Sequence, residues 1–206
     1  MSINTDAHPL PEASARPADA CDRADMARLA NGHDAALNDL MERHSMPVFH
    51  FLCRMLGNEE DAQDLAQETF VRVYRARESF RPNEKFTTWL FTIAANLARN
   101  HFRWRTRHPN VSLDAPSGTT DQTLASTLPA NDPAPGEHAL TAERAAAVRA
   151  AVHELPEDLR EAIVLCEWEE RSVAEAATIL EATPKAVESR LYRARQLLRK
   201  RLEKWL

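Results

Sequence analysis

Aromatic and cationic side chains are concentrated between Phe80 and Arg107. This stretch contains four Phe and two Trp residues, interspersed with Lys and Arg. A flat ring offers a stacking platform for a nucleobase, and a neighbouring cation can pair with phosphate. The combination indicates binding to single-stranded nucleic acid. The alternative is that the rings pack on a neighbouring helix as part of the protein core.

The charge distribution predicts two separate contacts with a polyanion. The chain as a whole has 31 acidic and 26 basic residues and a net charge of −5. Arg72 to Arg107 nevertheless holds nine basic and two acidic residues, and Lys185 to Leu206 holds eight and two. Two basic segments in an acidic chain favour two localised contacts, since the acidic remainder limits non-specific binding to nucleic acid. The alternative for each segment is a solvated helix face.

The overall composition favours an all-α protein. Gly is scarce, with 4 residues in 206, and 44% of the chain is hydrophobic, which argues against a glycine-punctuated β fold. The three cysteines, Cys21, Cys53 and Cys166, are far apart, so we expect reduced thiols. His50 and Cys53 lie three positions apart, but no second pair accompanies them, and we expect no metal site.

Several functional classes are disfavoured by what the sequence lacks. No apolar run approaches the roughly 20 residues that cross a bilayer, so we expect a cytoplasmic protein without membrane insertion. No Ser/His/Asp set, phosphate-binding glycine loop or paired carboxylates occur. We therefore expect no catalysis and no cofactor.

The pattern along the chain predicts two small helical domains. Residues 1–23 are rich in Pro, Ala, Ser and Asp without a period, which is typical of a disordered tail. Helical periodicity extends over residues 24–108 and returns over residues 141–206. Residues 109–140 between them collect Pro, Gly, Ser and Thr, which predicts a flexible linker.

In the first domain, one long helix is expected between Gly57 and Phe80. Its apolar positions follow helical spacing and leave a polar face that includes one exposed Val. A valine among charges suggests a contact with another protein. The outward residues are Asp64, Gln67, Glu68, Val71 and Arg75. Pro82 and Asn83 indicate a loop, and the next helix is expected to begin near Thr87 with Leu90, Ile93 and Leu97 facing inward.

In the second domain, the spacing predicts a helix-turn-helix. Ser172 is expected to cap a short helix, with Glu175 completing a capping box. Thr183 and Pro184 then begin a longer basic helix, as a recognition helix would require. Six residues are expected to face outward from it, where they would read the major groove: Lys185, Ser189, Tyr192, Arg193, Gln196 and Lys200.

The two halves together resemble an extracytoplasmic-function (ECF) sigma factor of the sigma-70 family, which directs bacterial RNA polymerase to promoters. The first half carries the resemblance in DAQDLAQETFVRVYRARESFR and FTTWLFTIAANLARNHFR. The second half carries it in LPEDLREAIVLCEWEERSVAEAATIL and TPKAVESRLYRARQLLRKRL. The resemblance extends roughly from Asp25 to Leu206.

This resemblance implies partners and residue roles. The outward face of the long helix would bind core RNA polymerase, through the coiled coil of β′ and through β. The −10 promoter element would be captured as a single strand, with Phe80 and Asn96 lining the pocket of a flipped base. The full set implied for strand capture is Phe80, Lys85, Trp89, Asn96, Arg99 and Arg103. Arg190 joins the outward residues of the recognition helix in reading the −35 element of promoter DNA. An anti-sigma factor is a further expected partner.

Two features depart from the family pattern. The tail of residues 1–23 has no counterpart in the minimal family pattern, and we assign it no role. Glu188 lies on the recognition helix where a basic or small residue would suit a flanking phosphate, so a −35 preference does not carry over. The competing hypothesis is a helix-turn-helix regulator with a helical ligand-sensing first domain. That hypothesis explains the second half equally well, but it gives no reason for the aromatic and cationic stretch in the first.

Overall fold

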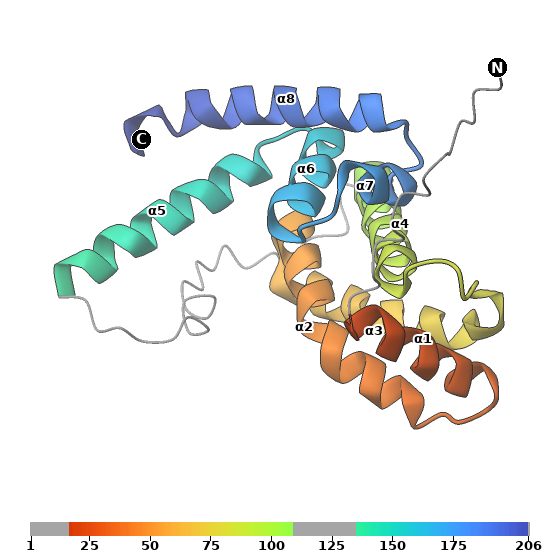
Figure 1. Ribbon diagram of the computed structural model, residues 1–206. Helices are drawn as coiled ribbons and strands as arrows, with labels where there is room; N and C mark the ends of the chain where they lie inside the picture. Colours follow the sequence, from red (N-terminus) through yellow and green to blue (C-terminus); the bar gives the residue numbers. More distant parts are fainter. Residues whose placement is uncertain (1–16, 109–134, 206) are drawn as a thin grey trace, which may run out of the picture.

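The computed structural model describes residues 17–108 and 135–205, and every regular element within these ranges is helical. None of the helices described is long and apolar enough to cross a membrane. Figure 1 shows the elements in chain order: α1 (Pro17–Ala30), α2 (Ala36–Leu56), α3 (Glu59–Arg75), η1 (Arg77–Ser79), α4 (Phe86–Arg107), α5 (Pro135–His153), α6 (Glu157–Ile163), η2 (Val164–Trp168), α7 (Val173–Ile179), α8 (Pro184–Arg201) and η3 (Glu203–Trp205).

Helices α1 to α4 form the N-terminal domain. Helix α2 packs against α1, α3 and α4, and its Leu40, Phe51 and Leu52 are fully buried. The side chain of Asn58 caps α3 by accepting from the backbone N–H of Asp61 at 3.0 Å. This cap satisfies a backbone donor that the first turn of a helix leaves free.

Helix α1 corrects the expectation that residues 1–23 form a disordered tail. Residues 1–16 lie outside the described part, but the helix begins at Pro17. Asp22 is only 1% exposed and accepts from Arg43 Nε at 3.0 Å and from His44 Nε2 at 2.9 Å. The composition of this segment indicates a solvent-exposed tail. Composition cannot show that Asp22 is buried, because its partners lie about twenty residues away on α2.

Helices α5 to α8 form the C-terminal domain, and the expected helix-turn-helix is confirmed. Ser172 and Glu175 make the capping box of α7, and Thr183 caps α8 with Pro184 in its first turn. Helix α5 begins at Pro135, earlier than the expected boundary at residue 141. Of the expected linker, residues 109–134 lie outside the described part.

The two domains pack directly against each other. Helix α4 contacts α7, and α2 contacts α5, α6 and η2, so helices of the two domains lie side by side (Figure 1). Buried apolar residues of both halves form one cluster. The sequence predicts two separate bodies, because each half shows a complete helical pattern of its own. The contact between them is not encoded in either pattern.

The end of α2 shows how close this approach is. Gly57 ends the helix with φ of 71°, a left-handed conformation that glycine adopts without steric cost. A Cβ at this position would lie 2.5 Å from Cε1 of His153, a residue of the C-terminal domain. Gly57 therefore allows the left-handed backbone at the end of α2 and also leaves room for the side chain of His153.

We expect Gly57→Ala to destabilise the protein more than Gly32→Ala. Gly32 also has a positive φ, of 86°, but a Cβ there would meet nothing within 4 Å. Both substitutions incur the left-handed backbone cost of about 1–2 kcal/mol, and only Gly57→Ala adds the clash with His153. Thermal unfolding measures the difference. The clash is contradicted if His153→Ala fails to reduce the excess cost of Gly57→Ala.

Candidate nucleic-acid interface

Three of the six aromatic rings between Phe80 and Arg107 are part of the packing around α4. Phe86 and Phe91 are each 1% exposed, and the Phe91 ring lies edge-on to Phe51 with centroids 5.3 Å apart. Phe102 is half-buried beneath the guanidinium of Arg160. These rings are unavailable for base stacking in this conformation. The alternative interpretation, that rings pack on neighbouring helices, therefore holds for them.

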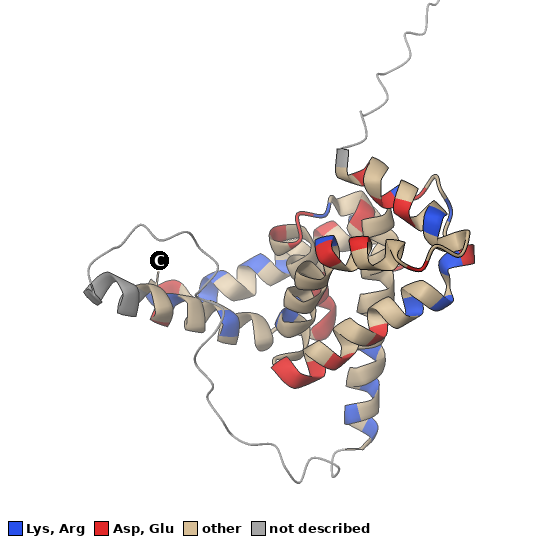
Figure 2. Cartoon of the chain, turned by 90° about the horizontal axis from the view of Figure 1, so that it is seen from below, with Lys and Arg blue, Asp and Glu red and all other residues tan. Residues whose placement is uncertain are grey.

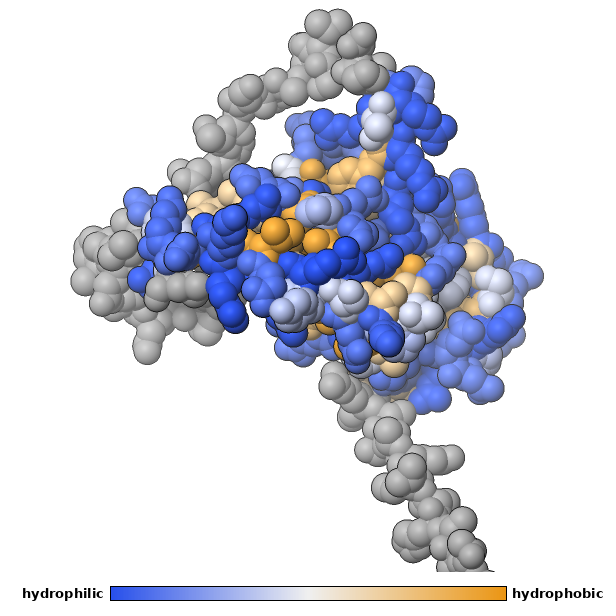
Figure 3. Space-filling model, turned by 90° about the horizontal axis from the view of Figure 1, so that it is seen from above, coloured by the Kyte–Doolittle hydropathy of each residue, from blue (hydrophilic) through white to orange (hydrophobic). Residues whose placement is uncertain are grey.

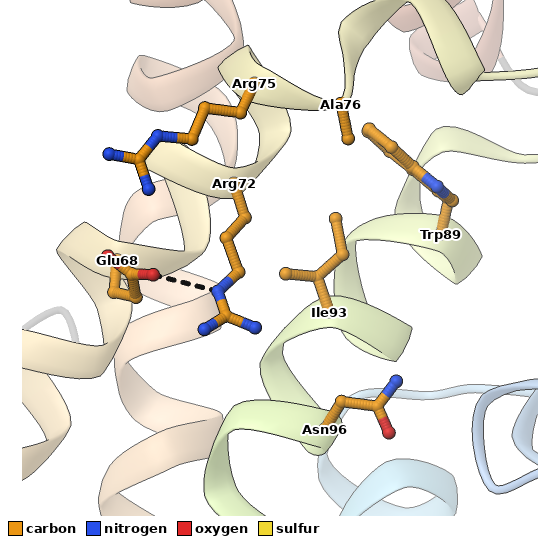
Figure 4. A pocket seen from close by; sticks show the side chains of 7 residues that line it. All are labelled: Glu68, Arg72, Arg75, Ala76, Trp89, Ile93 and Asn96. Atoms are coloured by element: carbon orange, nitrogen blue, oxygen red, sulfur yellow. Dashed lines mark hydrogen bonds and ion pairs between the residues drawn. The ribbon is translucent and has the colours of Figure 1, made fainter. Parts of the chain in front are cut away.

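A groove of about 440 Å³ lies between α3 and α4, and Trp89 is the aromatic residue in its lining (Figure 4). Trp89, Ile93 and Asn96 contribute one face at helical spacing along α4. The opposite wall comes from α3, where Glu68 accepts from Arg72 Nε at 2.8 Å. The complete lining is Glu68, Arg72, Arg75, Ala76, Trp89, Ile93 and Asn96.

This groove has the chemistry of a nucleobase site. Trp89 supplies a flat ring, Asn96 supplies an amide that can match a base edge, and Arg72 supplies a cation. Phe80 does not line the groove but packs against Phe86 and Trp89, with ring centroids 6.1 and 5.3 Å away. Phe80 is therefore a packing partner of the Trp89 ring.

The other residues expected to capture a strand face the C-terminal domain. Lys85 Nζ lies 2.8 Å from Glu175 Oε1, and Arg99 NH1 lies 3.4 Å from Glu161 Oε2. Arg99 also donates to the side-chain oxygen of Asn96. A second, larger depression of about 600 Å³ adjoins these groups. Its lining includes Asn96, Arg99, Arg103, Glu157, Glu161 and Arg190.

The expected polymerase-binding residues lie on the outer surface of α3. Asp64, Gln67, Val71 and Arg75 are exposed, and Val71 exposes 40% of its surface. Glu68 is half-buried instead, because it turns toward Arg72 and the groove. This face has no contact with the C-terminal domain among the element contacts described.

The expected −35 residues lie along α8. Lys185, Ser189, Tyr192, Arg193, Gln196 and Lys200 are all exposed. Arg190 is half-buried and lies 3.7 Å from Asp158. The face on the α8 side is mostly hydrophilic and is interrupted by several small apolar patches (Figure 3). Lys and Arg also recur along the end of α4 (Figure 2).

Several residues of the domain contact were not anticipated. Arg171 of the C-terminal domain donates to Thr87 Oγ1 at 2.9 Å and covers the Phe91 ring at 4.9 Å. Arg160 donates to the backbone oxygen of Met55 at 2.6 Å. Arg54 pairs with Glu169 at 3.1 Å. Sequence signals for these pairs are lacking, because each joins positions at least eighty residues apart.

The carboxylates at this contact have shifted pKa values. Burial raises the pKa of Glu161 and of Glu169 from 4.5 to about 7, although Arg99 and Arg54 oppose the shift. Glu175 behaves differently. Burial tends to raise its pKa, but hydrogen bonds from Lys85 and Ser172 lower the pKa to about 2.

Comparison with family models and known proteins matches both halves of the chain. Residues 40–108 match the model of Sigma-70 region 2, and residues 145–198 match that of Sigma-70, region 4. The chain is 34% identical over 176 residues to the ECF RNA polymerase sigma factor SigW of Bacillus subtilis, an alignment that covers 85% of this chain and 93% of SigW. It is also 34% identical over 180 residues to the RNA polymerase sigma-H factor of Pseudomonas aeruginosa, with 85% and 91% covered.

A solved structure agrees with these matches. The structure of CnrH in complex with the cytosolic domain of CnrY is 28% identical in sequence and superposes with a TM-score of 0.65. The match covers 89% of this chain and 98% of CnrH. The similarity thus extends over both domains.

We expect the thermal stability to fall as the pH rises from about 6.5 to about 8. Glu161 and Glu169 have higher pKa values in the folded state than in the unfolded state. Their contribution to the free energy of unfolding is therefore fully present below the unfolded pKa, and it is lost as the pH rises through about 7. Burial lowers the pKa of His153. The contribution of His153 to stability is therefore lost as the pH falls below 6.5, so it does not add to the decline above that pH. The melting temperature should drop by several degrees, about 2–4 °C per kcal/mol.

The double variant Glu161→Gln with Glu169→Gln is the control for this pH dependence. Gln keeps the shape of each side chain but does not titrate, so the melting temperature of the variant should decline less over the same range. Parallel curves for the two proteins would show that other groups set the pH dependence.

Proposed function

The chain belongs to the extracytoplasmic-function sigma factors of the sigma-70 family, and we propose that it binds core RNA polymerase and directs it to specific promoters. It would recognise the −35 and −10 elements and help to melt the −10 region. The observation that carries this proposal is the match to region 2 and region 4, in that order, in one chain. The relatives that match over most of their length are named as RNA polymerase sigma factors.

We propose that the α3–α4 groove receives a base flipped out of the non-template strand. Trp89 would stack on the base, and Asn96 would bond its Watson–Crick edge. Arg72, which the sequence interpretation did not include, would sit beside the base or its phosphate. Extruding a base costs a few kcal/mol, which stacking and hydrogen bonds in such a pocket can offset.

The exposed surfaces of α8 and α3 would contact the other partners. Helix α8 would enter the major groove of the −35 element with Lys185, Ser189 and Arg193 at base edges and phosphates. The outer face of α3, with Gln67 and Val71 at its centre, would bind the β′ coiled coil. The polymerase supplies the catalytic centre, so we propose no enzymatic activity for this chain and a cytoplasmic location.

An anti-sigma factor is a further proposed partner. Family membership carries this suggestion, and CnrH was solved in complex with the cytosolic domain of a second protein, CnrY. Such a partner would act by covering the surfaces that bind the polymerase. The alternative of a ligand-sensing helix-turn-helix regulator leaves the match to region 2 unexplained.

Transcription reconstituted from purified components tests the proposed function. Core RNA polymerase with this chain should initiate at a defined set of start sites on genomic DNA fragments, and core polymerase alone should not. A native pull-down should recover the complex. Failure of the chain to bind core polymerase, or specific duplex binding as a free dimer, would favour the regulator instead.

We expect Asn96→Ala to impair promoter opening without loss of polymerase binding. Losing the contacts to a flipped base should cost about 1–3 kcal/mol, roughly a five- to 150-fold loss in open-complex yield. The defect should shrink on a template that is already melted with the non-template base changed. Potassium permanganate footprinting of duplex promoters measures the opening.

Asn100→Ala is the matched control, since Asn100 is exposed on the same helix one turn further on. Asn96 also accepts from Arg99, so the melting temperature of each variant must be recorded. A destabilised Asn96→Ala protein with normal opening per folded molecule would contradict the role of Asn96 in base capture.

We expect Arg193→Ala to weaken recognition at one position of the −35 element. Loss of a bidentate contact to guanine should cost about 1–3 kcal/mol at that position alone. Arg199→Ala removes the same charge from the last turn of α8 and should act uniformly across sequences. Transcription from a library of −35 variants separates the two patterns. If Arg193→Ala changes neither the level nor the sequence preference, Arg193 does not contact the promoter.

A further inference from the structure

His44 of α2 lies between a carboxylate of α1 and the aromatic rings beside the α3–α4 groove. Its Nε2 donates to Oδ1 of Asp22 at 2.9 Å, and its side chain is only 12% exposed. Its ring also packs against Phe86, with ring centroids 5.2 Å apart and the planes tilted by 53°. A histidine held by a carboxylate at one nitrogen has a fixed ring orientation, since the hydrogen bond also sets which nitrogen carries the proton. His44 therefore links α1 to the start of α4.

Asp22 is firmly anchored between α1 and α2. It is 1% exposed and accepts from Arg43 Nε at 3.0 Å as well as from His44. Arg43 also donates to Asp25, one turn further along α1, at 2.6 Å. A buried carboxylate is stable only when it is hydrogen-bonded to such partners, so Asp22 cannot turn away without leaving its charge unpaired. The position of His44 therefore depends on the attachment of α1.

Three aromatic rings extend the contact from His44 to the groove. Phe86 is 1% exposed, and its ring centroid lies 6.2 Å from that of Trp89 and 6.1 Å from that of Phe80. The centroids of Phe80 and Trp89 are 5.3 Å apart. Aromatic pairs at these distances prefer tilted or edge-on arrangements, so the rings adjust together. Because Trp89 lines the groove (Figure 4), a displacement of Phe86 would change the groove itself.

The first turn of α4 depends on support from outside the helix. Its N-cap residue, Lys85, makes no side-chain capping bond, and residues 81–85 before it are all exposed. The first backbone N–H groups of a helix have no partner within it, so a turn without a side-chain cap is held less firmly. Within the N-terminal domain, α1 contacts both α4 and η1, the short helix before this loop. Helix α1 is thus placed to hold both ends of the loop that leads to the groove.

We propose that His44, fixed by Asp22 of α1, is a positioning residue for base capture. It holds Phe86, and through Phe86 the Trp89 ring, in the orientation on which a flipped base would stack. His44 is not among the described residues that line the groove, so it acts without touching the DNA. This inference rests on the proposed role of the α3–α4 groove.

A double-mutant cycle between His44 and Trp89 tests this coupling. Core RNA polymerase is saturated with each variant, so that differences in polymerase affinity do not contribute, and permanganate footprinting measures promoter opening. His44→Ala should lower the open-complex yield about tenfold, within the range of coupling between residues that share contacts. In the Trp89→Leu background, which lowers opening by itself, His44→Ala should cause little further loss. Equal losses in both backgrounds, or no loss from His44→Ala alone, would overturn the proposal.

Substitutions of Asp22 and Arg28 separate the positioning role from general attachment of α1. Asp22→Asn keeps an oxygen that can accept from His44 and should retain most of the opening. Asp22→Leu keeps the approximate shape without an acceptor and should lose opening as His44→Ala does; it replaces His44→Ala in the cycle if that variant does not fold. Arg28→Gln is the matched control, because it removes the ion pair of α1 with Asp39 through a side chain that is half exposed. Equal opening by the two Asp22 variants, or an equal loss in Arg28→Gln, would reduce α1 to a general scaffold and overturn the proposal.

Fluorine NMR of the free chain tests the displacement of the ring without polymerase. Labelling with 5-fluorotryptophan gives one resonance for each of the four Trp residues, assigned by single Trp→Phe substitutions. His44→Ala and Asp22→Leu should shift or broaden the Trp89 resonance. The resonance of Trp104, which is 48% exposed near the other end of α4, should not change.

The spectra and the opening assay together decide the outcome. An unchanged Trp89 resonance in folded His44→Ala protein overturns the proposal. A changed resonance with normal opening overturns it as well, because the orientation of the ring would then not matter for base capture. A wild type that opens no promoter contradicts the proposed function itself, and the spectrum then still decides whether His44 sets the position of Trp89.

Discussion

The packing of α4 against both domains constrains the rest of the structure. Its Phe86, Leu90 and Phe91 fill the N-terminal core, while other positions on its circumference receive α7 and the groove beside α3. A helix used on so many sides has little freedom to shift, so the groove residues are held on a rigid support. The burial of Phe86 and Phe91 also explains why aromatic residues occur in this segment, since large rings fill the space between packed helices.

Charged groups at the domain contact differ in whether their surroundings stabilise or destabilise the charge. Glu175 is a favourable partner, because a lysine and a helix cap together stabilise its charge. Glu161 and Glu169 are more deeply buried, and their arginine partners do not fully offset the loss of water. The Arg99–Glu161 and Arg54–Glu169 pairs are therefore less favourable than the pair of Lys85 with Glu175.

Local features were predictable from the sequence, and the relations between the halves were not. The capping box at Ser172, the start of α8 at Thr183 and the outward face of α8 each depend on residues close together in the chain, and the structure shows them as expected. The tail boundary was wrong, since the partners of Asp22 are on another helix. The contact of Arg171 with Thr87 was not predicted for the same reason. The place of Arg72 in the groove was not predicted, because the opposite wall belongs to α4. Helical periodicity identifies a buried face but does not say which element will cover it.

The two side-chain oxygens of Glu175 have separate partners, and this affects how quickly the molecule can change state. One oxygen accepts from Ser172 within its own helix start, and the other pairs with Lys85 across the contact. Breaking the second bond leaves the first intact, so α7 does not have to unwind when the domains part. A movement of the C-terminal domain away from α4 would therefore need no refolding of α7, and it could follow the microsecond-to-millisecond timescale of rigid-body motions.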